Sequence, residues 1–161
     1  MRTLVSSYDA ALFDLDGVVY LGPNAIDGVT SALAKLREVG TRLGFVTNNA
    51  ARTPVAVAEH LRELGIQADE LDVVNSTQAT VRMLREELPV RAKVLVVGTD
   101  ALASQLAEGG FVPVSTLEEN PVAVVQGYHP QLPWGLLELG AIAIQRGAAW
   151  FATNPDQTRP T

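Results

Sequence analysis

The stretch Ala10-Ala11-Leu12-Phe13-Asp14-Leu15-Asp16-Gly17 is an apolar run that ends in two aspartates and a glycine. Residues 9–15 have the composition of a β-strand. Because residues i and i+2 of a strand point to the same side, Asp14 and Asp16 are predicted to project together while Leu15 faces the other way. Open parallel sheets bind ligands beyond the carboxyl ends of their strands, so this turn is the first candidate for a functional site.

The segments that follow alternate between β-branched runs and stretches with helical periodicity. Short connections between alternating strands and helices require right-handed crossovers, which predicts an α/β fold with a doubly wound parallel sheet. The expected strands are residues 9–15, 42–47, 71–74, 93–97, 111–114, 122–126 and 148–153. The expected helices begin near Asp27, Thr53, Asn75, Thr99 and Pro133, with Asp27 as the cap of the first.

The composition excludes several classes of protein. The chain has 161 residues, 47% of them apolar, which is enough for a folded core. Its net charge of -6 argues against nucleic-acid binding and against docking to a membrane surface. The absence of cysteine excludes disulfides, zinc–thiolate sites and thiol nucleophiles. No signal-peptide pattern is visible in residues 1–11, and we expect a cytoplasmic protein.

Two carboxylates at one strand end repel each other and are costly to desolvate. A hard cation offsets that repulsion, and Mg²⁺ usually takes one or two carboxylates together with waters and a substrate phosphate. Gly17 allows a tight turn that brings backbone N–H groups close to an anion. Asp14 and Asp16 are therefore candidate Mg²⁺ ligands, although two aspartates that only cap backbone donors would give the same short motif.

A second polar group, Thr47-Asn48-Asn49, ends the predicted strand at residues 42–47. A hydroxyl, two amides and backbone N–H groups at a parallel strand's carboxyl end suit a bound phosphate, because neutral donors hold an oxyanion without a buried cation. A polar loop with left-handed Asn is the alternative interpretation. The neighbouring aspartate pair favours the phosphate site.

The motifs Asp14-Leu15-Asp16-Gly17-Val18 and Thr47-Asn48-Asn49 resemble the first two motifs of the haloacid dehalogenase-like phosphatases. The wider pattern, with residues 97–102 and 152–156, is similar to the NagD-like subfamily, which includes nitrophenyl phosphatases and actinobacterial glycerol-3-phosphate phosphatases. The resemblance implies a Rossmann-like core with an inserted α/β cap, both incomplete in this chain. Residues 1–87 would belong to the catalytic core and residues 88–161 to the cap.

The same resemblance assigns roles to individual residues. Asp14 would be the nucleophile that becomes an aspartyl-phosphate, and Asp16 would protonate the leaving alcohol and later activate water. Both aspartates would hold Mg²⁺. The implied substrate-binding residues are Gly17, Thr47, Asn48, Asn49 and Asn154.

Members of this family also carry a lysine motif and a further acidic motif after the cap. The only lysines here, Lys35 and Lys93, both precede that position. We therefore expect the first part of a longer protein, and severely impaired activity from these residues alone, since one missing charge-stabilising group costs roughly 10²–10³ in rate. A small phosphorylated metabolite, for example glycerol 3-phosphate, is the expected substrate, and a homodimer through the cap is a further expectation.

Three alternatives to an active phosphatase are consistent with parts of the sequence pattern. A phosphate-receiver module is also acidic and doubly wound, but it places its phosphorylated aspartate on a later strand than its acidic pair. A non-catalytic α/β interaction module would not need the combination of Asp14, Asp16 and Thr47. An inactive fragment of the phosphatase is the third alternative, because the later motifs are missing.

Overall fold

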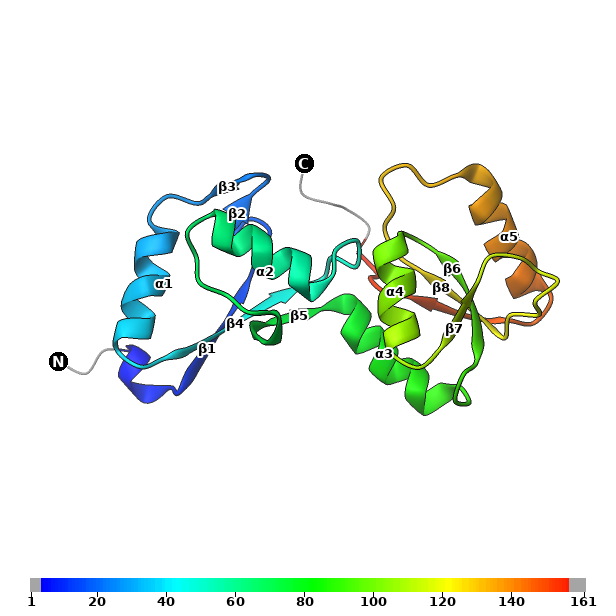
Figure 1. The fold of residues 1–161 in the computed structure, drawn as a ribbon, viewed down its shortest axis with the longest axis horizontal. Helices are drawn as coiled ribbons and strands as arrows, with labels where there is room; N and C mark the ends of the chain where they lie inside the picture. The colour runs from blue at the N-terminus through cyan, green and yellow to red at the C-terminus, as the bar shows by residue number, and fades with distance from the viewer. Residues whose placement is uncertain (1–3, 157–161) are drawn as a thin grey trace. The chain divides into compact units, whose positions relative to one another are not determined.

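The computed structural model describes residues 4–156 and groups them into two compact units (Figure 1). Of the described residues, 4–47 and 54–74 form the first unit, and 48–53 and 75–156 form the second. The short segment 48–53 thus belongs to the second unit, although the residues directly before and after it in the chain belong to the first. Each unit has its own sheet and its own core.

The first unit is built on a small sheet in the order β1-β4-β5, in which β1 and β4 are parallel. A short antiparallel hairpin, β2–β3, follows β1. The elements are η1 (Leu4–Ser7), β1 (Ala10–Asp14), β2 (Tyr20–Leu21), β3 (Asn24–Ala25), α1 (Val29–Glu38), β4 (Arg42–Thr47), α2 (Pro54–Glu63), η2 (Glu70–Asp72) and β5 (Val73–Asn75).

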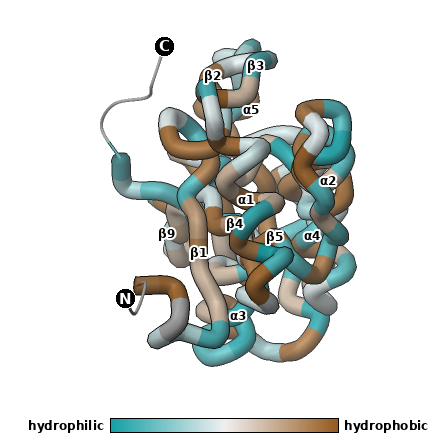
Figure 2. The backbone as a smooth tube through the Cα atoms, turned by 90° about the vertical axis from the view of Figure 1, so that its left-hand side faces the viewer, coloured by the Kyte–Doolittle hydropathy of each residue, from teal (hydrophilic) through white to brown (hydrophobic). Residues whose placement is uncertain are grey.

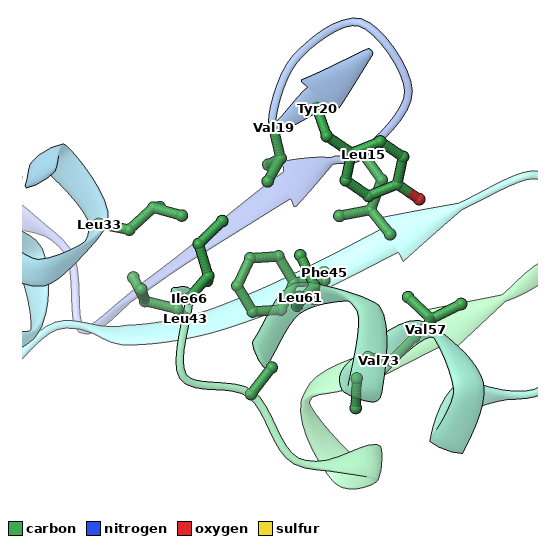
Figure 3. Packing of buried hydrophobic residues seen from close by; sticks show 12 residues of the cluster. Leu15, Val19, Tyr20, Leu33, Leu43, Phe45, Val57, Leu61, Ile66 and Val73 are labelled. Atoms are coloured by element: carbon green, nitrogen blue, oxygen red, sulfur yellow. The ribbon is translucent and has the colours of Figure 1, made fainter. Parts of the chain in front are cut away.

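The core of the first unit lies on one face of this sheet. Phe45 of β4 is completely buried, and Leu61 of α2 and Ile66 pack in the same cluster (Figure 3). Residues on the opposite face are open: within the described chain, Leu12 of β1 is 75% exposed and Val46 of β4 is 39% exposed. The strands of this unit are therefore buried on one side only.

The second unit has a four-stranded sheet in the order β7-β6-β8-β9, in which all neighbouring strands are parallel. Helices cover both faces (Figure 1): Leu102 and Leu106 of one helix pack on one side, and Ala143 of another packs with Leu95 and Val124 on the other. The elements are α3 (Ser76–Glu87), β6 (Lys93–Val97), α4 (Asp100–Glu108), β7 (Val112–Val114), β8 (Ala123–Gln126), α5 (Trp134–Gln145) and β9 (Ala149–Ala152).

The predicted parallel α/β architecture is confirmed, and each expected strand and helix is present within a few residues of its predicted bounds. Two local predictions fail. The first helix is not capped by Asp27, because Gly28 occupies the N-cap position with φ 81° and no side-chain cap bond. The β2–β3 hairpin is absent from the expected strands, because its two-residue strands are too short to give an alternating pattern.

Amphipathic helices account for the packing of both units. Figure 2 shows hydrophobic and hydrophilic residues together along α2, and its buried residues are Val57, Ala58 and Leu61. Within residues 4–156, no helix combines the length and the apolarity needed to cross a bilayer.

The division into a core at residues 1–87 and a cap at 88–161 stays a prediction, and α3 is grouped with the second unit.

Candidate active site

Asp14 is the last residue of β1, and the chain leaves the sheet directly after it. Leu15 is completely buried, whereas Asp14 is exposed and Asp16 is half-buried. This is the alternation that the sequence predicts. One carboxylate oxygen of Asp14, Oδ1, accepts a hydrogen bond of 2.9 Å from the Leu15 amide, which restrains the side chain at the end of the strand.

The turn after Asp14 is closed by backbone hydrogen bonds. The carbonyl oxygen of Leu15 accepts from the amide of Val19 at 2.9 Å, and the Gly17 amide donates to the carbonyl of Tyr20 at 2.8 Å. Gly17 has φ 83°, a left-handed conformation that favours glycine. Leu15 and Tyr20 anchor both ends of the turn in the core (Figure 3). The tight turn is confirmed, and its glycine N–H is used within the turn.

Thr47 lies at the carboxyl end of β4, beside β1. The parallel register pairs Asp14 with Val46, so Thr47 stands one residue beyond the level of Asp14. Its side chain is only 3% exposed. Adjacent parallel strands end at the same edge of a sheet, and the first unit therefore brings Asp14, Asp16, Gly17 and Thr47 to one edge. Two carboxylates and a hydroxyl at that edge suit a cation bound together with an anionic ligand.

The other three predicted residues belong to the second unit. The Asn49 Oδ1 accepts from the Ala51 amide at 2.8 Å, and the Asn154 Oδ1 accepts from the Asp156 amide at 2.7 Å. Both are side-chain-to-backbone turns of the kind that Asn commonly forms. Asn48 donates from its side-chain Nδ2 to the carboxylate of Asp156. The sequence does not predict this pairing, because the two residues lie 108 positions apart.

Metal binding can be judged from the donors present. Among residues 4–156, no group of three or more His, Cys, Asp and Glu side chains is arranged to hold a metal ion. The first unit offers the two carboxylates of Asp14 and Asp16 at one strand end. This donor set fits Mg²⁺, which takes only one or two protein carboxylates and completes its octahedron with waters and phosphate oxygens. It does not fit a cation that needs a cage built only from protein side chains.

Comparison with known proteins gives a consistent result. A family model described as haloacid dehalogenase-like hydrolase matches residues 11–112. The chain is 43% identical over 161 residues to the D-glycerol 3-phosphate phosphatase of Mycobacterium tuberculosis, covering 100% of this chain and 45% of that protein. It is 35% identical over 156 residues to an acid sugar phosphatase of Staphylococcus aureus, covering 97% of this chain and 59% of that one.

Solved structures agree with the sequence matches. The crystal structure of the M. tuberculosis glycerol phosphate phosphatase in complex with magnesium superposes with a TM-score of 0.93 at 43% identity, over 100% of this chain and 48% of that one. A p-nitrophenyl phosphatase from Archaeoglobus fulgidus gives a TM-score of 0.81 at 30% identity, over 94% and 57%. The chain thus spans about half the length of these relatives. It belongs to the haloacid dehalogenase-like hydrolase family.

Proposed function

We propose that the complete protein is a Mg²⁺-dependent phosphatase that hydrolyses a small phosphomonoester through an aspartyl-phosphate on Asp14. The observation that carries the proposal is the placement of Asp14 and Thr47 at the ends of two neighbouring parallel strands, in a chain of this hydrolase family. Relatives named as phosphatases support the reaction class.

The reaction has two steps. In the first, an oxygen of the Asp14 carboxylate attacks phosphorus, the phosphorus–oxygen bond to the substrate alcohol breaks, and Asp16 gives its proton to the departing oxygen. In the second, Asp16 takes a proton from water, the water oxygen attacks phosphorus, and the bond to Asp14 breaks to release inorganic phosphate. A covalent carboxylate intermediate divides one difficult displacement into two easier ones.

The positions of the two aspartates are compatible with these roles. Asp14 is exposed at the end of its strand, which leaves it accessible to a substrate phosphorus atom. Asp16 follows on the closed turn, where the bonds of Leu15 and Gly17 fix the backbone. A rigid turn keeps the proton donor at a constant distance from the nucleophile, and such positioning supplies much of the rate in phosphoryl transfer.

Mg²⁺ would be held by the carboxylate of Asp14 and by the backbone carbonyl of Asp16. When bound, the ion neutralises charge that develops on the transferred phosphoryl group. The hydroxyl of Thr47 and the backbone N–H of Asn48 would bind phosphate oxygens, with Gly17, Asn49 and Asn154 as further proposed substrate contacts. Magnesium is present in the crystal structure of the M. tuberculosis relative.

The substrate we propose is glycerol 3-phosphate or a phosphorylated metabolite of similar size, as the name of the M. tuberculosis relative suggests.

We also propose a cytoplasmic location, residues 88–161 as part of a cap, and a homodimer formed through that cap. Size-exclusion chromatography with light scattering tests the dimer. A monomer at micromolar concentration would contradict it.

The experiment that tests the function is phosphate release by the complete gene product. We expect turnover of glycerol 3-phosphate and p-nitrophenyl phosphate that is lost when Mg²⁺ is chelated and restored when it is added back. Asp14→Asn should abolish turnover, because an amide cannot act as the nucleophile. Full activity in that variant would exclude Asp14 as the nucleophile.

A further inference from the structure

The segment 48–53 follows Thr47 directly in the chain, yet its contacts group it with the second unit. The hydroxyl of Ser76, the first residue of α3, donates to the Asn48 carbonyl at 2.9 Å. Asn48 itself donates to the carboxylate of Asp156. The backbone that continues the proposed phosphate site is therefore held by residues of the second unit.

Asn75 makes the most enclosed of these contacts. It is 1% exposed, and its side-chain Nδ2 donates to the Arg52 carbonyl at 3.0 Å and to the Gln105 Oε1 at 2.8 Å. Its Oδ1 accepts from the Gln78 amide at 3.0 Å and thereby caps α3. One side chain thus caps a helix with its oxygen and binds the 48–53 segment with its nitrogen.

Gln105 of α4 fixes the orientation of the Asn75 amide. It is 6% exposed, and its Nε2 donates to the Ala101 carbonyl one turn earlier at 3.1 Å. That bond directs its Oε1 toward Asn75. Buried polar groups are almost always hydrogen-bonded, and a fully satisfied network specifies one arrangement. The two amides therefore connect α4 to the carbonyl of Arg52.

Packing at Ala50 supports the same attachment. Ala50 is 2% exposed. A side-chain carbon added to Gly127, at the end of β8, would lie 3.5 Å from the Ala50 Cβ and only 2.9 Å from the Leu102 Cδ2. The segment thus lies in van der Waals range of the strand end at Gly127, where an added side-chain carbon would require Leu102 to shift.

We propose that Asn75 and Gln105 are positioning residues that hold segment 48–53, and with it the backbone N–H of Asn48, in the conformation that binds the substrate phosphate. The inference rests on the proposed function. The side-chain amides of Asn75 and Gln105 are buried and lie outside the family's first two motifs, and the proposal gives them the role of positioning segment 48–53. Neither side chain is assigned a contact with the substrate or with Mg²⁺.

The two roles of Asn75 can be separated by substitution. Serine is as good a helix N-cap as asparagine, so Asn75→Ser keeps the cap of α3 and removes the amide donor to Arg52. Gln105→Met removes the partner amide while filling a similar volume. Thr80→Val is the matched control, because Thr80 is 3% exposed on the same helix and, among residues 4–156, its hydroxyl bonds within α3, to the Ser76 carbonyl at 2.9 Å.

The first readout is amide hydrogen exchange of residues 48–53 in the complete gene product. Asn75→Ser and Gln105→Met should both accelerate exchange in this segment, while Thr80→Val should leave it unchanged. The double variant should exchange no faster than Asn75→Ser, because both residues act through one bond to Arg52. Exchange in 48–53 that stays at the wild-type rate in both single variants would overturn the attachment.

The second readout separates phosphate binding from stability. In Asn75→Ser we expect kcat/KM to fall by up to about 10²-fold, with KM and the Kd for inorganic phosphate, measured by calorimetry, rising in parallel. Thr80→Val should keep both constants. Equal losses in Asn75→Ser and Thr80→Val would reduce the role of Asn75 to stability and overturn the proposal. If the wild-type protein hydrolyses no phosphoester, the proposed function fails instead, and the exchange and phosphate-binding results still decide the inference.

Discussion

Asp14 of β1 lies opposite Val46 of β4 in the parallel register of the first unit. This pairing puts the proposed nucleophile level with the residue that precedes Thr47, the proposed phosphate ligand. Two motifs that are far apart in the sequence thus reach one edge of one sheet.

Asp16→Asn should separate the two chemical steps. The p-nitrophenolate ion leaves without needing a proton, so the first step should survive, whereas hydrolysis of the aspartyl-phosphate loses its general base. In the complete gene product we expect a burst of p-nitrophenol close to one equivalent, followed by turnover reduced about 10²–10⁴-fold. Stopped-flow absorbance measures both phases. Slow turnover without a burst would mean that Asp16 is not the general base of the second step.

Thr47 should affect phosphate binding through its hydroxyl alone. Thr47→Val preserves the shape of this buried side chain and removes the donor, so kcat should fall by about 10²–10³-fold, as it does for single donors to a developing oxyanion. Thr47→Ser retains a hydroxyl and serves as the control, with most of the activity kept. Comparable losses in both variants would indicate a packing role.

Gly17→Ala should destabilise the first unit without any steric clash. No heavy atom lies within 4 Å of the added carbon, but φ is 83°, and a left-handed backbone costs a residue with a side chain about 1–2 kcal/mol. Urea unfolding measures the loss. Gly135→Ala is the control, because Gly135 lies in α5 with equal space and no positive φ, and alanine there should raise stability by up to about 1 kcal/mol. Identical effects at both positions would refute the backbone explanation.

The open face of the β1-β4-β5 sheet leads to a prediction about the rest of the protein. Parallel sheets are normally covered on both faces, and the M. tuberculosis relative is about twice as long as this chain. Leu12→Thr should change the stability of a polypeptide of residues 1–161 by less than about 0.5 kcal/mol, since Leu12 is 75% exposed there. In the complete gene product we expect a loss of about 1–3 kcal/mol.

Val90→Thr is the control for that comparison, because Val90 is 91% exposed in a loop of the second unit. It should be nearly neutral in both polypeptides. If Leu12→Thr were as neutral as Val90→Thr in the complete gene product, no further segment would cover this face.

Much of the fold could be predicted from the sequence because the strands are short apolar runs and the helices have clear stripes. The carboxyl-end position of Asp14 and Thr47 follows from the same patterns, since the strand ends are marked by the change to polar residues. His60 shows where periodicity is insufficient. It lies outside the apolar stripe Val57, Ala58 and Leu61 of α2, yet its side chain is only 16% exposed and its ring packs edge-on against Tyr20 with centroids 5.0 Å apart.

The polar contacts between distant segments could not be predicted. Asn48 and Asp156 are 108 residues apart, and Asn75 and Arg52 are 23 apart. Asparagine caps helices, forms turns and binds ligands with the same atoms, so its identity does not select a partner. Only the tertiary structure shows that Asn75 performs two of these tasks at once.

Covalent trapping shows whether the phosphoryl group is transferred to Asp14. The complete gene product, mixed with Mg²⁺ and ³²P-labelled substrate and quenched in acid within the first turnover, should carry label on the peptide that contains Asp14. Asp14→Asn should carry none. Rapid hydrolysis with no labelled peptide, or with the label on another residue, would rule out an aspartyl-phosphate on Asp14.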